Sequence, residues 1–404
     1  MKKAMQLALG IVTSVGGFFD IGNIATSAQA GARFRFQLLW PLLLGTLLVI
    51  FLVEMSGRFA AVSRKALPDA IREHFGFTFW LVPFLVLTLV HFLVLGSEIG
   101  GICFALHLVT GLPTPLWALP VAVLTWLFLW RSTFSTIENS TSLLGLITLV
   151  FVVAVFRHHP PLGEILAGVL PSLPQHDPEK YWAMAVAILG AVLSPYLFYF
   201  YSSGAVEDEW DRSYVGVNRG IAFLGMGFGG AIALGGVIVA AMVLAPRGIQ
   251  VNDYHEAAMM LTGAFPFWGF LLFALSMGIA CLGGALEVSL SMAYATAQTF
   301  GWNWGESLDP REDARFCLTY TGTILLASLL ILCGVDPLRL TVFSMTIEAA
   351  VLPFVALPFL LVMNDRKLLK EHANGWLANT IAVVVLVLSL VLTAVSIPLA
   401  FLGG

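Results

Sequence analysis

The sequence predicts an all-helical protein that crosses a membrane many times. Of its 404 residues, 59% are hydrophobic and 11% are charged, whereas soluble domains carry about 25% charged residues. The mean hydropathy is +0.91. Apolar stretches long enough to cross a bilayer as helices recur from one end of the chain to the other. The connections between them are short and hold nearly all the charge, so we expect no soluble domain.

Eleven spans are expected, each followed by a short polar or glycine- and proline-containing connection. They lie near residues 8–31, 37–55, 78–110, 114–130, 141–157, 182–203, 219–246, 264–299, 316–334, 338–363 and 378–402. The third and eighth spans are longer than an upright helix needs, which indicates tilt or projection beyond the bilayer.

The distribution of basic residues predicts the orientation of the chain. With a cytoplasmic N-terminus, 14 of the 20 Lys and Arg residues fall in cytoplasmic segments and 6 fall outside, in agreement with the excess of positive charge in cytoplasmic loops. An odd number of spans then places the C-terminus outside. The short connections and the absence of sorting signals suggest a multi-pass protein of a bacterial inner membrane.

Composition and motifs exclude several functional classes. The net charge of −4 gives no basic surface for nucleic acid. The four cysteines lie scattered in apolar segments without metal-ligand spacing. No nucleotide-binding, zinc-hydrolase or nucleophile-elbow motif is present. We therefore expect neither an enzyme nor a resident cofactor, and a monomer whose partners are the lipid bilayer and a transported solute.

Two spans at matching positions carry interruptions. Eleven spans permit two five-helix repeats, near 8–157 and 182–363, followed by an extra helix near 378–402. Inverted repeats of this kind bind substrate where a helix breaks at the same place in each half. Span 1 contains Asp20-Ile21-Gly22-Asn23, and span 6 contains Ser194-Pro195 followed by a polar, aromatic run. The sequence therefore predicts a solute site between spans 1 and 6.

Asp20 and Asn23 are the strongest candidates for chemistry. Both fall near the middle of the first span, where a carboxylate costs several kcal/mol unless it is paired, protonated or bound to a cation. Gly22 lets the backbone unwind and turn carbonyl oxygens toward a cavity. A carboxylate, an amide and free carbonyls suit a divalent cation. The alternative is a hydrogen-bonded Asp20 that only stabilises helix contacts.

These residues resemble the NRAMP family of divalent metal transporters, which has Asp-Pro-Gly-Asn at this place. The resemblance continues through the second helix with Gln29 to Ala32 and Leu38 to Trp40. Weaker similarities lie at Asp69 to Glu73, Glu98 to Gly100, Phe300 to Trp302 and Leu352 to Phe354. The resemblance implies a LeuT-like fold of two inverted five-helix repeats plus an eleventh helix, with helices 1 and 6 broken. It also implies alternating access and metal ligands from Asp20, Asn23, the carbonyl of Ala191 and the side chain of Ser194.

The departures from the family pattern bear on the ion. The family has Met-Pro-His in helix 6, where this chain has Ser194-Pro195-Tyr196, and a second family His is matched by Tyr201. A thioether favours transition metals, whereas a hydroxyl leaves oxygen ligands that suit a hard cation. In helix 3, Leu95 replaces one of two family acids.

These differences resemble the NRAMP-related magnesium transporters and predict transport of Mg²⁺, or of a broad range of hard cations including Mn²⁺, without strong proton coupling. Glu98, Glu348, Tyr196 and Tyr201 are candidates for gating or for the surroundings of the ion. For Glu98 and Glu348, packing hydrogen bonds are the alternative role.

Other functions stay open at this point. One is a proton-coupled Mn²⁺ or Fe²⁺ transporter with substituted ligands. Another is a symporter of an amine or amino acid with the same architecture, although Asp20 argues against an anionic substrate. A third is a membrane scaffold that transports nothing.

Overall fold

The computed structural model describes residues 19–131, 145–305 and 311–402, with side chains described as far as residue 395. All regular secondary structure in these ranges is helical. The elements are α2 (Ile21–Phe34), α3 (Leu39–Ser63), α4 (Leu67–Phe75), α5 (Phe77–Thr110), α6 (Thr114–Arg131), η1 (Leu146–Thr148), α8 (Leu149–His158), α9 (Leu162–Gly168), α10 (Pro178–Val192), α11 (Pro195–Glu207), η2 (Arg212–Tyr214), α12 (Val215–Ile221), η3 (Ala222–Met226), α13 (Gly227–Val243), η4 (Ala245–Arg247), α14 (Tyr254–Thr262), α15 (Gly269–Phe300), α16 (Ala314–Leu332), α17 (Pro337–Val362), α18 (Arg366–Leu369), η5 (Lys370–His372) and α19 (Trp376–Leu402).

Each of the eleven expected spans has a helical counterpart in the described chain. Nine helical stretches there are long and apolar enough to cross a membrane, and a shorter apolar stretch covers Leu146–His158. The remaining span is represented by α2; its predicted first part, up to residue 18, lies outside the described residues. The third and eighth spans are long, as expected, with 34 residues in α5 and 32 in α15.

The sixth span is broken where its sequence predicts. Helix α10 ends at Val192, Ser194 has φ −55° and ψ 124°, and α11 begins at Pro195. The residue before a proline avoids the helical region, and proline suits the first position of a helix because it has no N–H to leave unpaired. The Ser194-Pro195 dipeptide therefore ends one helix and starts the next.

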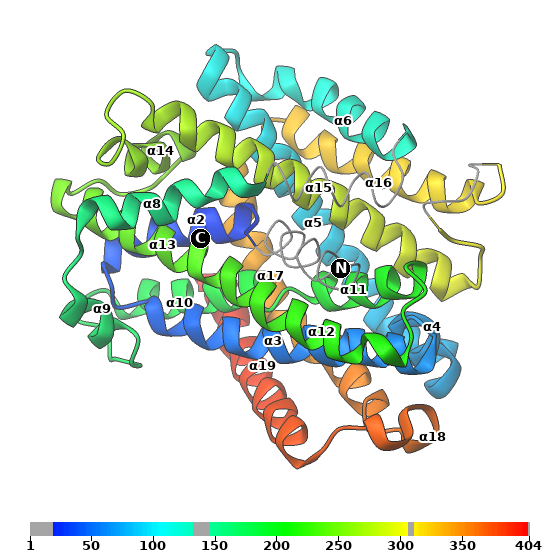
Figure 1. Cartoon of the computed structure of the whole chain (residues 1–404). Coiled ribbons are helices and arrows are strands. Elements are labelled where there is room, and N and C mark those ends of the chain that lie inside the picture. Colours follow the sequence, from blue (N-terminus) through cyan, green and yellow to red (C-terminus); the bar gives the residue numbers. More distant parts are fainter. Residues whose placement is uncertain (1–18, 132–144, 306–310, 403–404) are drawn as a thin grey trace.

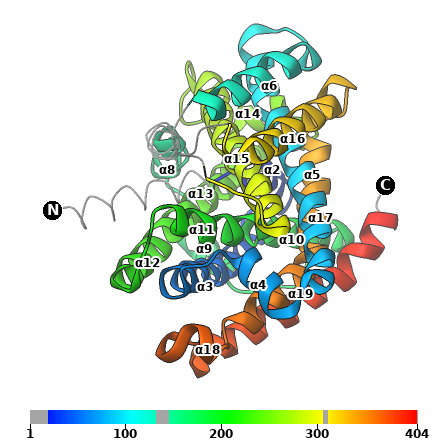
Figure 2. The ribbon, with the colours of Figure 1, turned by 90° about the vertical axis from the view of Figure 1, so that its right-hand side faces the viewer.

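The helices around this break occupy the middle of the bundle. Helix α2 packs against α10, α13 and α17, and α17 also packs against α5 and α10. Both views place α6 and α16 at one edge of the molecule and α18 at the opposite edge (Figures 1 and 2). The polar residues of the predicted site are therefore enclosed by helices, and outward-facing side chains such as Leu116, Leu318 and Leu326 are apolar and exposed, as lipid requires.

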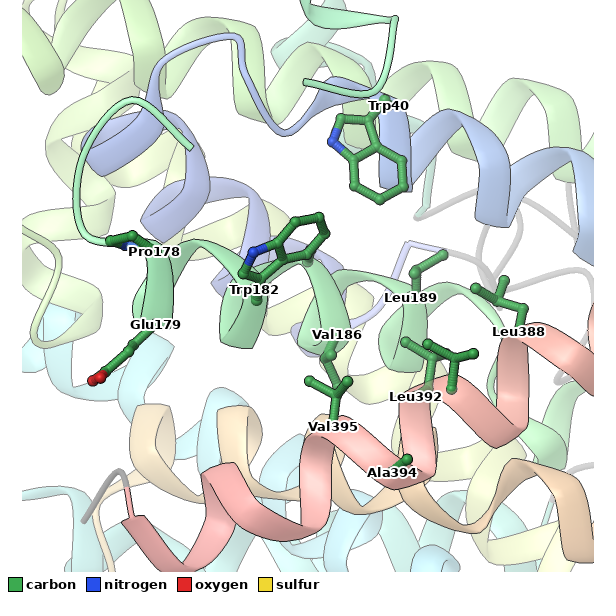
Figure 3. A pocket seen from close by; sticks show the side chains of 12 residues that line it. Trp40, Pro178, Glu179, Trp182, Val186, Leu189, Leu388, Leu392, Ala394 and Val395 are labelled. Atoms are coloured by element: carbon green, nitrogen blue, oxygen red, sulfur yellow. The ribbon is translucent and has the colours of Figure 1, made fainter. Parts of the chain in front are cut away.

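An apolar groove lies on the outside of the bundle, where α19 crosses α10. Its volume is about 720 Å³, and α3, α10 and α19 contribute its lining. Trp40, Trp182, Leu392 and Val395 line it, with Glu179 at one end (Figure 3). Because the lining is almost wholly apolar, this groove is not a site for an ion.

Candidate ion-binding site

Asp20 sits at the N-terminus of α2 and caps it. Its backbone is extended, with φ −97° and ψ −174°. Its Oδ1 accepts hydrogen bonds from the backbone N–H of Asn23 at 2.9 Å and from Asn23 Nδ2 at 3.2 Å. Both side chains are buried. The carboxylate thus lies at the positive end of the helix dipole, a place that favours negative charge, with the amide of Asn23 beside it.

Glu98 of α5 approaches the same helix end. Its Oε1 accepts the backbone N–H of Ile21 at 3.4 Å. The side chain is fully buried, and it lies so close to α15 that a Cβ on Gly284 would be 2.9 Å from both of its carboxylate oxygens. Glu98 therefore holds the start of α2 in place next to Asp20, while its role in gating stays a prediction.

The break in the sixth span provides the opposite side of the site. In an α-helix, the carbonyl of Ala191 would accept from the N–H four residues later, but that residue is Pro195, which has none. Ala191 and Ser194 are both buried. The break thus leaves the carbonyl of Ala191 without its helical hydrogen-bond donor, in the same turn of chain as the buried hydroxyl of Ser194.

Glu348 connects this break to α17. Ser194 Oγ donates a hydrogen bond to Glu348 Oε1, and Asp20 is close enough to Glu348 for their charges to interact. Tyr196, in the first turn of α11, is buried, and the charges of Asp20, Glu287, Glu98 and Glu348 all act on it. Side chains from α2, α5, α11 and α17 therefore act on one another electrostatically in this part of the bundle.

Met345 is a neighbour of this site whose importance the sequence did not reveal. A Cβ built on Gly22 would run into Met345 Sδ and would lie 3.2 Å from Asp20 Oδ1. A thioether therefore borders Gly22, two residues from Asp20, even though Ser194 replaces the family methionine, while the expectation of an all-oxygen ligand set stays a prediction. Met345 lies one turn before Glu348 on the same face of α17. This spacing is the sequence signal that could have identified Met345.

Tyr201 lies further from these groups than Tyr196 does. It is seven residues beyond Ser194, about 10 Å along α11, and its hydroxyl donates to Asn218 Oδ1 at 3.0 Å. Asn218 in turn donates from Nδ2 to the backbone carbonyl of Glu54 at 2.8 Å. Tyr201 thus joins α11 to α12 and α3, and its gating role stays a prediction.

Two further polar residues of the membrane-spanning helices join segments that are distant in the sequence. Ser97 Oγ lies 3.1 Å from Ser344 Oγ, and Gln29 Nε2 donates to the carbonyl of Val251 at 3.1 Å. Among the described residues, no group of three or more His, Cys, Asp or Glu side chains is placed to hold a metal. An ion bound here would accordingly depend on a mixed set of carboxylate, amide, hydroxyl and carbonyl oxygens.

Comparison with known proteins identifies the family. Residues 10–398 match the family described as Natural resistance-associated macrophage protein-like, or Nramp. The chain belongs to the Nramp family. Similar sequences include the "Divalent metal cation transporter MntH" of Deinococcus radiodurans, 26% identical over 95% of this chain and 88% of the relative. The protein of the same name from Caldanaerobacter subterraneus is 24% identical over 100% of this chain and 95% of the relative.

Solved structures agree on the fold. The Eremococcus coleocola manganese transporter, in complex with an aromatic bis-isothiourea compound, superposes with a TM-score of 0.76 at 18% identity, covering 98% of this chain and 87% of that one. Mhp1, a nucleobase-cation-symport-1 family transporter, gives 0.61 at 15% identity over 96% of this chain and 91% of that one.

MhsT, in complex with L-phenylalanine, gives a TM-score of 0.62 at 14% identity over 96% of this chain and 98% of that one. Together these neighbours confirm the LeuT-like fold class. Family membership also confirms a multi-pass membrane transporter rather than an enzyme.

Proposed function

We propose that this Nramp protein is a secondary transporter that moves divalent metal cations across the membrane by alternating access. Asp20 and Asn23 hold the ion from α2, and Ser194 and the carbonyl of Ala191 hold it from the α10–α11 break. The observation that carries the proposal is the buried Asp20 at the start of α2. Its charge acts on Glu348, which accepts a hydrogen bond from Ser194 at the α10–α11 break. The names of the MntH relatives support the same class of substrate.

The ion range follows from the donor set. Carboxylate, amide, hydroxyl and carbonyl oxygens suit Mg²⁺ and Mn²⁺, and the nearby thioether of Met345 favours Mn²⁺ over a strictly magnesium-selective site. We infer transport of hard cations including Mg²⁺ and Mn²⁺. Since Leu95 stands where the family has an acid, we also infer that proton flow is not tightly coupled to metal entry.

Transport requires the site to open to each side in turn. In our proposal the two five-helix repeats rock against one another about the ion, as in other transporters with inverted repeats. The chain acts as a monomer in a bacterial inner membrane, with its N-terminus in the cytoplasm and its C-terminus outside; the distribution of Lys and Arg supports this orientation.

One alternative has specific support. The structural neighbour from Eremococcus coleocola is named as a manganese transporter, and Glu98 lies at the start of α2 where a proton could be exchanged. A proton-coupled Mn²⁺ transporter is therefore the second candidate. A symporter of an organic amine or amino acid, a class represented by the MhsT complex, is less consistent with the acids around Asp20.

The test is uptake into proteoliposomes that contain the purified protein. Entry of Mg²⁺ and of Mn²⁺ is followed in separate runs while the internal pH is recorded. Asp20→Asn is the matched control, because an asparagine keeps an acceptor for the N–H of Asn23 but removes the charge. Entry of Mg²⁺ without acidification, lost in the variant, supports the proposal. Entry of Mn²⁺ with protons and no flux of Mg²⁺ refutes the ion range and establishes the alternative.

A further inference from the structure

We propose that Glu348 of α17 is a direct ligand of the transported ion, so that the site contains two carboxylates. This inference rests on the proposed function and extends it, because it adds a third helix to the pair that holds the ion.

The hydrogen bonds of Glu348 leave one oxygen available for a ligand. Its side chain is 1% exposed. Oε1 accepts the hydrogen bond from Ser194 Oγ, whereas Oε2 is buried and has no hydrogen-bond partner among the described residues. Buried polar atoms without partners are uncommon in proteins, and each needs an explanation, such as a water or an ion bound in the working state. The Ser194 hydroxyl thus orients the carboxyl group and leaves Oε2 to bind a cation.

The packing of α17 directs this helix face toward the start of α2 and toward the α10–α11 break. Met345 lies one turn before Glu348, and its sulfur borders Gly22 at the start of α2. A Cβ on Gly190 of α10 would collide with the carbonyl oxygen of Met345 and would be 3.2 Å from Ala349 Cβ. Only glycine permits these two close approaches. Glu348, between Met345 and Ala349, is thereby held between α2 and the α10–α11 break.

The charge balance favours ligation over packing alone. Within the described chain, no Lys, Arg or His side chain forms an ion pair with Glu348. Asp20 is the other charged group that acts on it. A buried carboxylate without a counter-charge is costly. A divalent cation between Asp20 and Glu348 neutralises both, and hard cations bind carboxylate oxygens preferentially.

The experiment measures binding of Mg²⁺ and of Mn²⁺ to the full-length protein in detergent by calorimetric titration. Glu348→Gln keeps the shape of the side chain and an acceptor for Ser194 but removes the charge. We expect it to weaken the affinity for both ions by about tenfold or more, since affinity at such sites follows the charge of the ligands. Glu348→Asp restores the charge and should recover part of the loss.

Glu287→Gln on α15 is the matched control. Glu287 is another buried carboxyl within the membrane, and its charge acts on Glu98 and Tyr196 but is not among the charges that act on Glu348. It should bind as the wild-type protein does. An equal loss in Glu287→Gln would mean that the effect is long-range electrostatics and would overturn the assignment. Wild-type affinity in Glu348→Gln would also overturn the assignment. If Glu348→Ala binds more weakly while Glu348→Gln binds normally, the side chain of Glu348 has a packing role.

Asp20→Asn separates this inference from the proposed function. If Asp20→Asn loses binding while Glu348→Gln retains it, Glu348 is not a ligand and the proposed function stands. If the wild-type protein binds neither ion, or Asp20→Asn binds and transports normally, the proposed site itself is wrong. Thermal unfolding and size-exclusion profiles of each variant establish that the protein is folded before its affinity is compared.

Discussion

The close approach of α17 to Gly22 leads to a quantitative prediction for Gly22→Ala. An added Cβ would collide with Met345 Sδ and would lie 3.0 Å from Met345 Cε and 3.2 Å from Asp20 Oδ1. Overpacking of this kind costs about 1–3 kcal/mol, offset by roughly 0.5–1 kcal/mol because alanine is a better helix former than glycine. We expect a net loss of up to about 2.5 kcal/mol in the free energy of unfolding, together with weaker ion binding as Asp20 shifts.

The assay is denaturant unfolding in detergent with divalent ions removed, followed by metal titration. Gly216→Ala in α12 is the control, because an added Cβ there meets nothing within 4 Å, so it should be neutral or slightly stabilising. Met345→Ala removes the side chain that Gly22→Ala would strike. In a protein that already carries Met345→Ala, Gly22→Ala should cause little further loss in the free energy of unfolding. A double-mutant cycle of the two substitutions measures this difference.

Two results would refute this reasoning. If Gly22→Ala is as stable as Gly216→Ala, then α17 does not approach α2 as closely as described. If the cost of Gly22→Ala is the same with methionine or alanine at position 345, the loss comes from somewhere other than the contact between these two helices.

Three further predictions test other parts of the molecule. Ser194→Met should raise uptake of Mn²⁺ relative to Mg²⁺ by roughly tenfold in competition assays, because a thioether favours transition metals; an unchanged ratio would exclude position 194 from the ion's surroundings. Trp80→Phe removes the hydrogen bond from Trp80 Nε1 to Thr299 Oγ1, 2.7 Å long and buried, and should lower the free energy of unfolding by about 1–2 kcal/mol without changing ion affinity. Burial raises the pKa of Asp69 in α4 from 3.8 to about 6 although the charge of Arg72 lowers it. The folded protein therefore holds a proton there that the unfolded chain releases, so stability should fall as the pH rises from about 4 to about 6. Asp69→Asn should flatten that slope in unfolding experiments, and an unchanged slope would contradict the assignment.

Local chemistry was sufficient to predict much of this protein. The positions of the helices follow from the length of the apolar stretches, and the break at Ser194-Pro195 follows from what proline does to the residue before it. Asp20 was identified because a carboxylate within an apolar stretch demands a partner. Each of these inferences depends on residues that are close together in the chain.

The partners of these residues could not be predicted in the same way. Ser194 and Glu348 are 154 residues apart in the sequence, and Ile21 meets Glu98 across 77 residues. In neither pair does the sequence around one residue indicate its distant partner. Met345 was overlooked because a methionine in an apolar helix is usually a packing residue, and only the approach of α17 to Gly22 distinguishes it.

The sequence by itself determined that the chain is a membrane-spanning helical protein with a break at Ser194-Pro195 and a buried acid in its first span. Only the tertiary structure decided that Glu98, Met345 and Glu348 join that acid. Helices such as α5 and α17 are apolar on all sides, so their sequences carry no stripe to indicate which face turns inward. Their rotation is set by close contacts at Gly22, Gly190 and Gly284, which form only when the whole bundle is packed.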